Sequence, residues 1–125
     1  MLHQKKKIKK NFKVLIIYIK STFNNTIITI TDLIGNVIYS DSAGKNGFKG
    51  SKKSTPFASQ IVTKNIISKL IEFGVKKIQI SLKGKGVGKE SALRIFKISS
   101  FEIISIKDDT SISFNGCRQP KRRRI

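Results

Sequence analysis

The sequence predicts a single-domain α/β sandwich: a mixed sheet of about five strands, covered by two main helices, with a basic tail at each end. The chain has 125 residues, of which 38% are apolar, which suits one domain with its own core. Its strand-like and helix-like segments follow in the order β-β-β-α-β-α-β. The last part of this order contains βαβ crossovers, which make strands parallel, beside an antiparallel meander.

The first three strands are expected where β-branched residues concentrate between turn-forming residues. Residues 12–20 are apolar on both faces, which indicates a strand buried on both sides. Residues 26–31 read TIITIT and favour a strand strongly. A third strand is expected at 37–40. Turns are expected at 21–25, where Asn24 and Asn25 tolerate turn conformations, and at 32–36. Short connections of this kind predict an antiparallel meander.

Two helices and two further strands follow. Thr55 and Pro56 favour a helix start, as a capping residue and a proline at the first helical position. Apolar residues then recur at helical spacing up to Phe73, and Gly74 is a natural stop. A second helix is expected at 90–99 and strands at 76–82 and 101–107. Residues 42–54 and 84–88 are expected to be glycine-rich loops.

The charge is extreme and unevenly placed. Lys and Arg number 26 against 7 Asp and Glu, so the net charge is +19. Such self-repulsion favours a polyanionic partner, first of all nucleic acid. The cations gather at 5–13, 45–53, 83–89 and 118–124, with few acids nearby. An ordinary solvated surface would carry mixed signs. Glycine beside lysine would let backbone N–H groups approach phosphate oxygens.

Other kinds of site are disfavoured. The single cysteine cannot form an internal disulfide, and one Cys with one His cannot supply a structural zinc site. The apolar run 14–19 is too short for a signal core or a bilayer span. The stretch GKGVGKES lacks the first glycine and the final hydroxyl residue of an NTPase phosphate loop. We therefore expect no catalytic residue, cofactor or metal, and no small-molecule substrate.

Four blocks resemble one known family. STFNNTIITITD (21–32), GFKGSKKSTPFASQ (47–60), LKGKGVGKES (82–91) and NGCRQPKRRRI (115–125) are similar to the small-subunit ribosomal protein eleven family in its bacterial and organellar form. The resemblance implies a mixed α/β fold with a five-stranded sheet. It also implies binding to rRNA at the platform of the small subunit near the messenger exit, beside neighbouring small-subunit proteins, with messenger RNA nearby.

The charge clusters and this resemblance together predict an RNA-binding set and three regions. The regions are a flexible basic tail at 1–11, an α/β domain at 12–110 and an rRNA-binding tail at 111–125. The RNA-binding set comprises Asn24, Asn25, Lys45, Lys49, Gly50, Ser51, Lys52, Lys53, Ser54, Thr55, Lys83, Lys85, Gly86, Lys89, Asn115, Gly116, Cys117, Arg118, Lys121, Arg122, Arg123 and Arg124.

Three alternative functions differ in the evidence they require. A general nucleic-acid-compacting protein would show little preference for sequence or shape. A Mg²⁺-dependent nuclease would have to gather Asp32, Asp41, Asp108 and Asp109, two of which flank expected turns. A protein bound to a membrane surface would need its cations on a helix with an apolar face, whereas here they lie mainly in tails and loops.

The codon preference that the composition implies bears on the source. The chain is rich in Ile and Lys, whose codons are rich in A and T. Together with the resemblance to bacterial and organellar proteins, this implies a ribosome of an organelle, a plastid or a mitochondrion, or of the cytoplasm of an A/T-rich bacterium.

Overall fold

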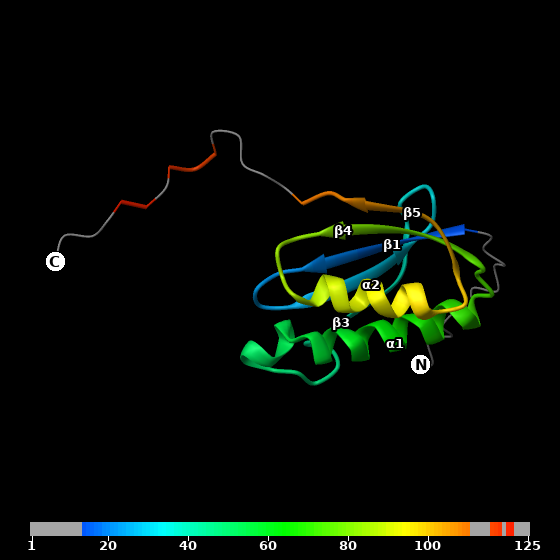
Figure 1. The fold of residues 1–125 in the computed structure, drawn as a ribbon, viewed down its shortest axis with the longest axis horizontal. Coiled ribbons are helices and arrows are strands. Elements are labelled where there is room, and N and C mark those ends of the chain that lie inside the picture. Colours follow the sequence, from blue (N-terminus) through cyan, green and yellow to red (C-terminus); the bar gives the residue numbers. More distant parts are fainter. Residues whose placement is uncertain (1–13, 111–115, 119, 122–125) are drawn as a thin grey trace, which may run out of the picture.

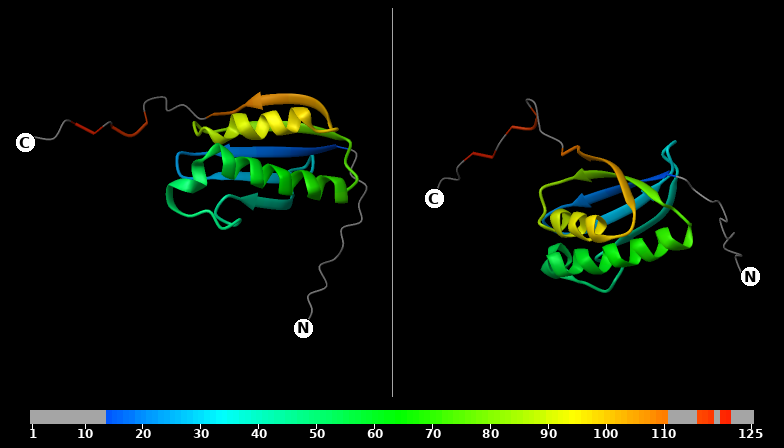
Figure 2. Two further views of the ribbon diagram at one scale, coloured as in Figure 1. Left: turned by 60° about the horizontal axis from the view of Figure 1, so that its bottom comes forward. Right: turned by 45° about the vertical axis from the view of Figure 1, so that its right-hand side comes forward.

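The computed structural model describes residues 14–110, 116–118 and 120–121. The expected tail at 1–11 and the predicted contacts of Asn115, Arg122, Arg123 and Arg124 lie outside the described residues. The described chain forms two layers, a sheet and a pair of helices that lie side by side on one of its faces (Figures 1 and 2). The elements are β1 (Val14–Ser21), β2 (Thr26–Thr31), β3 (Val37–Ser42), η1 (Gly50–Ser54), α1 (Pro56–Glu72), β4 (Lys77–Lys83), α2 (Gly88–Ile98) and β5 (Glu102–Asp108).

The sheet confirms the predicted fold class. Its five strands lie in the order β3-β2-β1-β4-β5. β1 pairs antiparallel with β2, and β2 pairs antiparallel with β3, which is the predicted meander. β1 pairs parallel with β4, and β4 pairs parallel with β5, as the two βαβ crossovers require.

The core lies between the sheet and the helices. In β1 the side chains of Leu15, Ile17 and Ile19 are fully buried, and they face residues such as Val62 and Phe96 of the helix layer. The intervening Tyr18 and Lys20 are exposed. The expectation that β1 is buried on both sides is therefore wrong, because both helices cover the same face of the sheet and leave the other face open.

The ends of α1 are those that the sequence predicts. The Thr55 side chain accepts a hydrogen bond from the Ala58 N–H at 3.3 Å, and Pro56 occupies the first turn. Gly74 follows the helix with a φ of 70°, a conformation that glycine adopts without strain. No helix in the described part of the chain combines the length and hydropathy needed to cross a membrane.

The loop that precedes α1 contains a short helix that the sequence did not indicate. Residues 50–54 form one 3₁₀ turn, with the N–H of Lys52 bonded to Lys49 and that of Thr55 bonded to Lys52. Glycine, serine and lysine do not favour such a turn by composition. The turn lies directly before the capped start of α1, and both the N–H and the hydroxyl of Thr55 donate to the Lys52 carbonyl.

Candidate nucleic-acid interface

One end of the domain collects most of the predicted binding segments. The parallel strands β1, β4 and β5 end at the same edge of the sheet, as does β3, which runs in the same direction (Figure 1). The turn 22–25, the loop 43–55 and the loop 84–87 therefore meet there, together with the first turns of α1 and α2. We call these segments the loop end. In open sheets with parallel strands, ligands bind outside such carboxyl ends.

The turn 22–25 lies between the loop 43–55, which we call the first glycine–lysine loop, and the loop 84–87, which we call the second. The residues on either side of the turn contact both loops. On one side, the Ala43 N–H donates to the Thr26 carbonyl at 3.1 Å. On the other side, the Gly86 N–H donates to the Ser21 carbonyl at 3.0 Å. Segments that are about 60 residues apart in the sequence thus form one surface.

The second loop needs its glycines for packing against β1 and β2. Gly84 has a φ of +100°, and a Cβ atom there would overlap the Ser21 carbonyl oxygen. A Cβ on Gly86 would collide with the Ser21 hydroxyl, and one on Gly88 with the Thr26 hydroxyl. Both hydroxyls are buried without a hydrogen-bond partner among the described residues. The sequence interpretation, that glycine opens the backbone to phosphates, is incomplete here, because the Gly86 N–H already bonds within the protein.

Most lysines of the loop end are free to meet an external anion. Lys49, Lys52 and Lys85, with Lys83 at the adjoining end of β4, are exposed, and none forms an ion pair within the described part of the chain. Lys45 is also exposed, but its ammonium group donates to the Ser40 carbonyl at 3.4 Å and lies 5.2 Å from the centre of the Tyr39 ring. Their ammonium groups bring concentrated positive charge to one surface. Such charge attracts a polyanion and makes its binding depend on salt.

Lys89 is different, because its ammonium group is used inside the domain. It donates to the Gly84 carbonyl at 3.0 Å and pairs with Asp108 at 3.3 Å. The pKa of Asp108 is lowered, first by the hydroxyl and backbone N–H of Thr110 and then by Lys89. Lys89 therefore ties the second loop to the end of β5.

The start of α1 adds a partial positive charge. α1, which is described in full, has no acidic residue in its first turn, and η1 places Lys52 and Lys53 directly before it. Ser51 is exposed beside these lysines, and Ser54 and Thr55 are half-buried. The helix dipole favours an anion at such a start, although Pro56 lacks an N–H group and Thr55 already caps the Ala58 N–H.

The loop end also exposes apolar side chains that the sequence analysis missed. Phe23 is 74% exposed at the tip of the turn 22–25, and Phe57 and Val87 are exposed in the neighbouring segments. Phe57 packs edge-on against Phe48, with 6.1 Å between ring centroids. The available signal was an aromatic residue inside a polar turn next to Asn24 and Asn25.

The turn that carries Phe23 is rigidly held. The Thr22 N–H donates to the Asn25 carbonyl at 2.8 Å, and the Thr22 hydroxyl oxygen accepts from the N–H groups of Asn24 and Asn25. The Asn25 side chain accepts the Thr26 N–H at 2.8 Å. An aromatic ring on a fixed turn is a preorganised stacking surface for an unpaired base.

The carboxylates do not form a nuclease site. Asp32 lies in the turn between β2 and β3, where its pKa is lowered by hydrogen bonds, first from the Asn36 backbone. Asp41 is buried and accepts hydrogen bonds from the side-chain amides of Asn46 and Asn65. Among the described residues, no three of His, Cys, Asp and Glu are grouped so that they could hold a metal ion.

The described part of the C-terminal segment is exposed. Gly116, Cys117, Arg118 and Lys121 all present their side chains or backbone to solvent, and the Cys117 thiol is free. The structure neither joins these residues to the loop end nor separates them from it. Their assignment to an RNA interface therefore rests on charge and on sequence similarity.

Comparison with known proteins agrees with the resemblance inferred from the sequence. The family model described as "Ribosomal protein S11" matches residues 15–124. The chain is also 53% identical to "Small ribosomal subunit protein uS11c" of Cyanidium caldarium. That alignment extends over 129 positions and covers 100% of both chains.

Proposed function

The chain belongs to the ribosomal protein S11 family, and from this premise we propose that its loop end binds rRNA at the platform of the small subunit, near the messenger exit. The protein is a structural component of the small ribosomal subunit and not an enzyme. Its partners are rRNA and other ribosomal proteins. The suffix c of the relative's name denotes a chloroplast-type protein, which supports a ribosome within an organelle.

The observation that carries the proposal is the convergence of cations at one end of the fold. Lysines from the 43–55 and 83–89 segments surround a rigid turn and the start of α1. An rRNA backbone folded against this end would meet ammonium groups from two directions. The protein would thereby stabilise converging RNA strands that otherwise repel one another.

Different residues of the predicted set have different roles in this proposal. Lys45, Lys49, Lys52, Lys53, Lys83 and Lys85 neutralise phosphates, and the Ser51 hydroxyl donates a hydrogen bond to a phosphate or ribose oxygen. Ser54 and Thr55 shape the turn before α1, because their hydroxyls donate to the Ser51 and Lys52 carbonyls. Asn24 and Asn25 present amide groups beside Phe23, which stacks on a base. Gly50, Gly86 and Lys89 shape the loops. The tail residues, Asn115, Gly116, Cys117, Arg118, Lys121, Arg122, Arg123 and Arg124, follow the RNA backbone.

The position near messenger RNA is inferred from the family resemblance. In this arrangement the protein has no direct chemistry to perform. It holds rRNA hairpin loops in the shape that messenger exit requires, and recognition is mainly of shape and phosphate.

Binding of the full chain to small-subunit rRNA tests the proposal. The variant Lys52→Gln/Lys53→Gln should bind more weakly than Lys64→Gln/Lys97→Gln, which removes the same charge from exposed positions on α1 and α2. If about six to ten phosphates are contacted, affinity should fall about 10³–10⁵-fold between 50 and 200 mM salt. Equal losses in the two variants, or a flat salt response, would contradict an interface at the loop end.

The alternative of a nucleic-acid-compacting protein is separated by competition. Excess duplex DNA should leave the complex with small-subunit rRNA largely intact if the protein recognises folded RNA. Complete displacement by bulk duplex at equal nucleotide concentration would favour the compacting function instead.

A further inference from the structure

The open face of the sheet carries an exposed tyrosine at its centre. Tyr18 lies on β1, the middle strand, and is 42% exposed on the face that no helix covers. Its hydroxyl forms no hydrogen bond within the described part of the chain. A half-exposed aromatic ring on an open sheet face offers a flat surface on which a planar aromatic group can stack.

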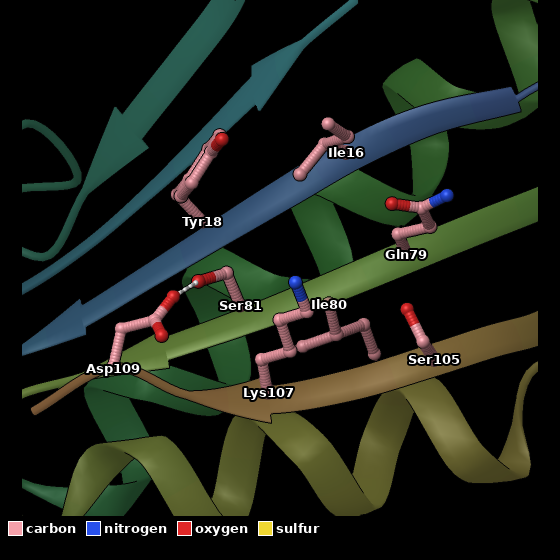
Figure 3. Close-up of a pocket in the computed structure, with 8 residues that line it drawn as sticks. All are labelled: Ile16, Tyr18, Gln79, Ile80, Ser81, Ser105, Lys107 and Asp109. Carbon is pink, nitrogen blue, oxygen red and sulfur yellow. Dashed lines mark hydrogen bonds between the residues drawn. The ribbon is translucent and has the colours of Figure 1, made fainter. Parts of the chain in front are cut away.

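The neighbours of Tyr18 leave room around its ring. Thr29 on β2 and Ser81 on β4 are its direct cross-strand partners, and both are small. Two hollows adjoin the ring as a result. One, of about 130 Å³, extends over β4 and β5 towards Gln79 and Ser105, as Figure 3 shows. The other, of about 300 Å³, extends over β2 towards Ile27.

The rim of these hollows is cationic. Lys20 and Lys83 line the larger hollow and Lys107 the smaller one, and none of the three forms an ion pair within the described residues. Asp109 is the acidic residue that lines both, and it accepts a hydrogen bond from the Ser81 hydroxyl at 2.9 Å (Figure 3). The surface thus combines an aromatic platform, small hydroxyl groups and an excess of positive charge.

We propose that this open face is a second RNA-binding surface, on which an unpaired base of the small-subunit rRNA stacks against Tyr18 while the adjoining phosphates contact Lys20, Lys83 and Lys107. The proposal rests on the proposed rRNA-binding function and adds a site to it. The new site is continuous with the loop end, because Lys83 is the last residue of β4 before the second glycine loop.

The chemistry of the face favours RNA over a protein partner. The buried centres of protein–protein interfaces are depleted of lysine, whereas three unpaired lysines surround this ring. Sheet faces that bind single-stranded RNA use aromatic side chains in this way, because every base offers a face for stacking. The hydroxyl and amide groups of Ser105, Thr29 and Gln79 can donate to base edges or ribose.

The first test compares Tyr18→Leu with Tyr18→Phe in the full chain. Tyr18→Leu keeps an apolar side chain but loses stacking, so its affinity for small-subunit rRNA should fall about tenfold. Tyr18→Phe keeps the ring and should bind within about twofold of the parent chain. The melting temperature of each variant reports whether the fold is intact. Equal binding by Tyr18→Leu and the parent would overturn the proposal.

A second test does not depend on the tyrosine. Lys107→Gln should weaken rRNA binding more than Lys64→Gln, an equal charge change on α1. Ultraviolet crosslinking followed by mass spectrometry should give a nucleotide adduct on a peptide that contains residue 18. Equal effects of the two lysine variants together with no adduct would overturn the proposal.

The outcomes also separate this proposal from the proposed function. If the parent chain binds rRNA and loses affinity through Lys52 and Lys53 but not through Tyr18, only the second surface fails. If the parent chain does not bind rRNA at all, the proposed function fails first. Protection of the open face only when other small-subunit proteins are added would assign it to a protein partner and overturn the RNA assignment.

Discussion

At the residue scale, Gly84 illustrates a position that only glycine can occupy. Its φ of +100° disfavours any side chain, and a Cβ would overlap the Ser21 carbonyl oxygen. Gly84→Ala should therefore lower the free energy of unfolding in urea by about 1–3 kcal/mol or more, because the backbone must move.

Gly35→Ala is the matched control. Gly35 has a φ of +110° but no atom within 4 Å of a new Cβ, so its cost is conformational only, about 1 kcal/mol. Equal costs at the two positions would contradict the packing argument.

We expect the exposed ring of Phe23 to contribute little to the stability of the fold. Phe23→Ala removes an exposed ring from a turn held by backbone and Thr22 hydrogen bonds, so stability should change by less than about 0.5 kcal/mol. Affinity for small-subunit rRNA should fall by about 1–3 kcal/mol, the usual value of base–aromatic stacking.

The matched control for Phe23 is Ile34→Ala. Ile34 is also an exposed apolar residue in a turn, but it lies between β2 and β3 at the opposite end of the sheet. Its removal should leave rRNA affinity unchanged in the same titration. A loss of affinity in Ile34→Ala as large as in Phe23→Ala would indicate a general effect of surface hydrophobicity rather than stacking.

At the element scale, α1 holds the first glycine–lysine loop through a partly buried polar network. The Asn65 amide donates to Asn46 at 2.6 Å and to the buried Asp41 carboxylate at 3.3 Å. Asn65→Ala leaves these acceptors with fewer donors and should destabilise the domain by about 1–3 kcal/mol. Hydrogen exchange should accelerate at the amides of residues 43–49, while the amides of β1 change only through global stability. Gln60→Ala, an exposed position on the same helix, is the control and should change neither quantity.

Element positions followed from the sequence where one physical signal dominated. Thr55, Pro56 and Gly74 fixed the ends of α1 because capping and backbone conformation are local properties. The β-prone run 26–31 is a strand with those same bounds. η1 was missed because its formation depends on how the loop closes on α1. The exposure of Tyr18 was missed because an apolar run on both sides of a strand does not reveal whether a second layer exists.

At the scale of the whole molecule, the sequence shows which residues make up the proposed binding surface but not how they are arranged. The lysine clusters and the turn at Asn24 and Asn25 are visible along the chain. Their convergence depends on the parallel pairing of β1 with β4, a contact between residues about 60 positions apart. The same pairing explains why glycine is needed at positions 84 and 86. A Cβ atom at either position would collide with Ser21, which directly precedes the turn 22–25. No local pattern distinguishes such packing glycines from glycines that face a phosphate.

The net charge of +19 leads to a last prediction, in which one variable has opposite effects on folding and on binding. Added salt screens the mutual repulsion of the lysines, since the Debye length falls from about 10 Å at 0.1 M to about 3 Å at 1 M. The melting temperature of the isolated chain should therefore rise with potassium chloride. The affinity for rRNA should fall over the same range, because releasing counterions into a more concentrated salt solution gains less entropy. A matched pair of variants separates the two effects. Lys52→Gln/Lys53→Gln and Lys64→Gln/Lys97→Gln each remove two charges, so the salt dependence of the melting temperature should weaken similarly in both. Only Lys52→Gln/Lys53→Gln should reduce the slope of log affinity against log salt, by about 1.4–1.8, because of the four lysines only these two belong to the proposed phosphate-binding set. Identical slopes for the two variants would mean that the charge acts as a diffuse field and that the loop end has no special role.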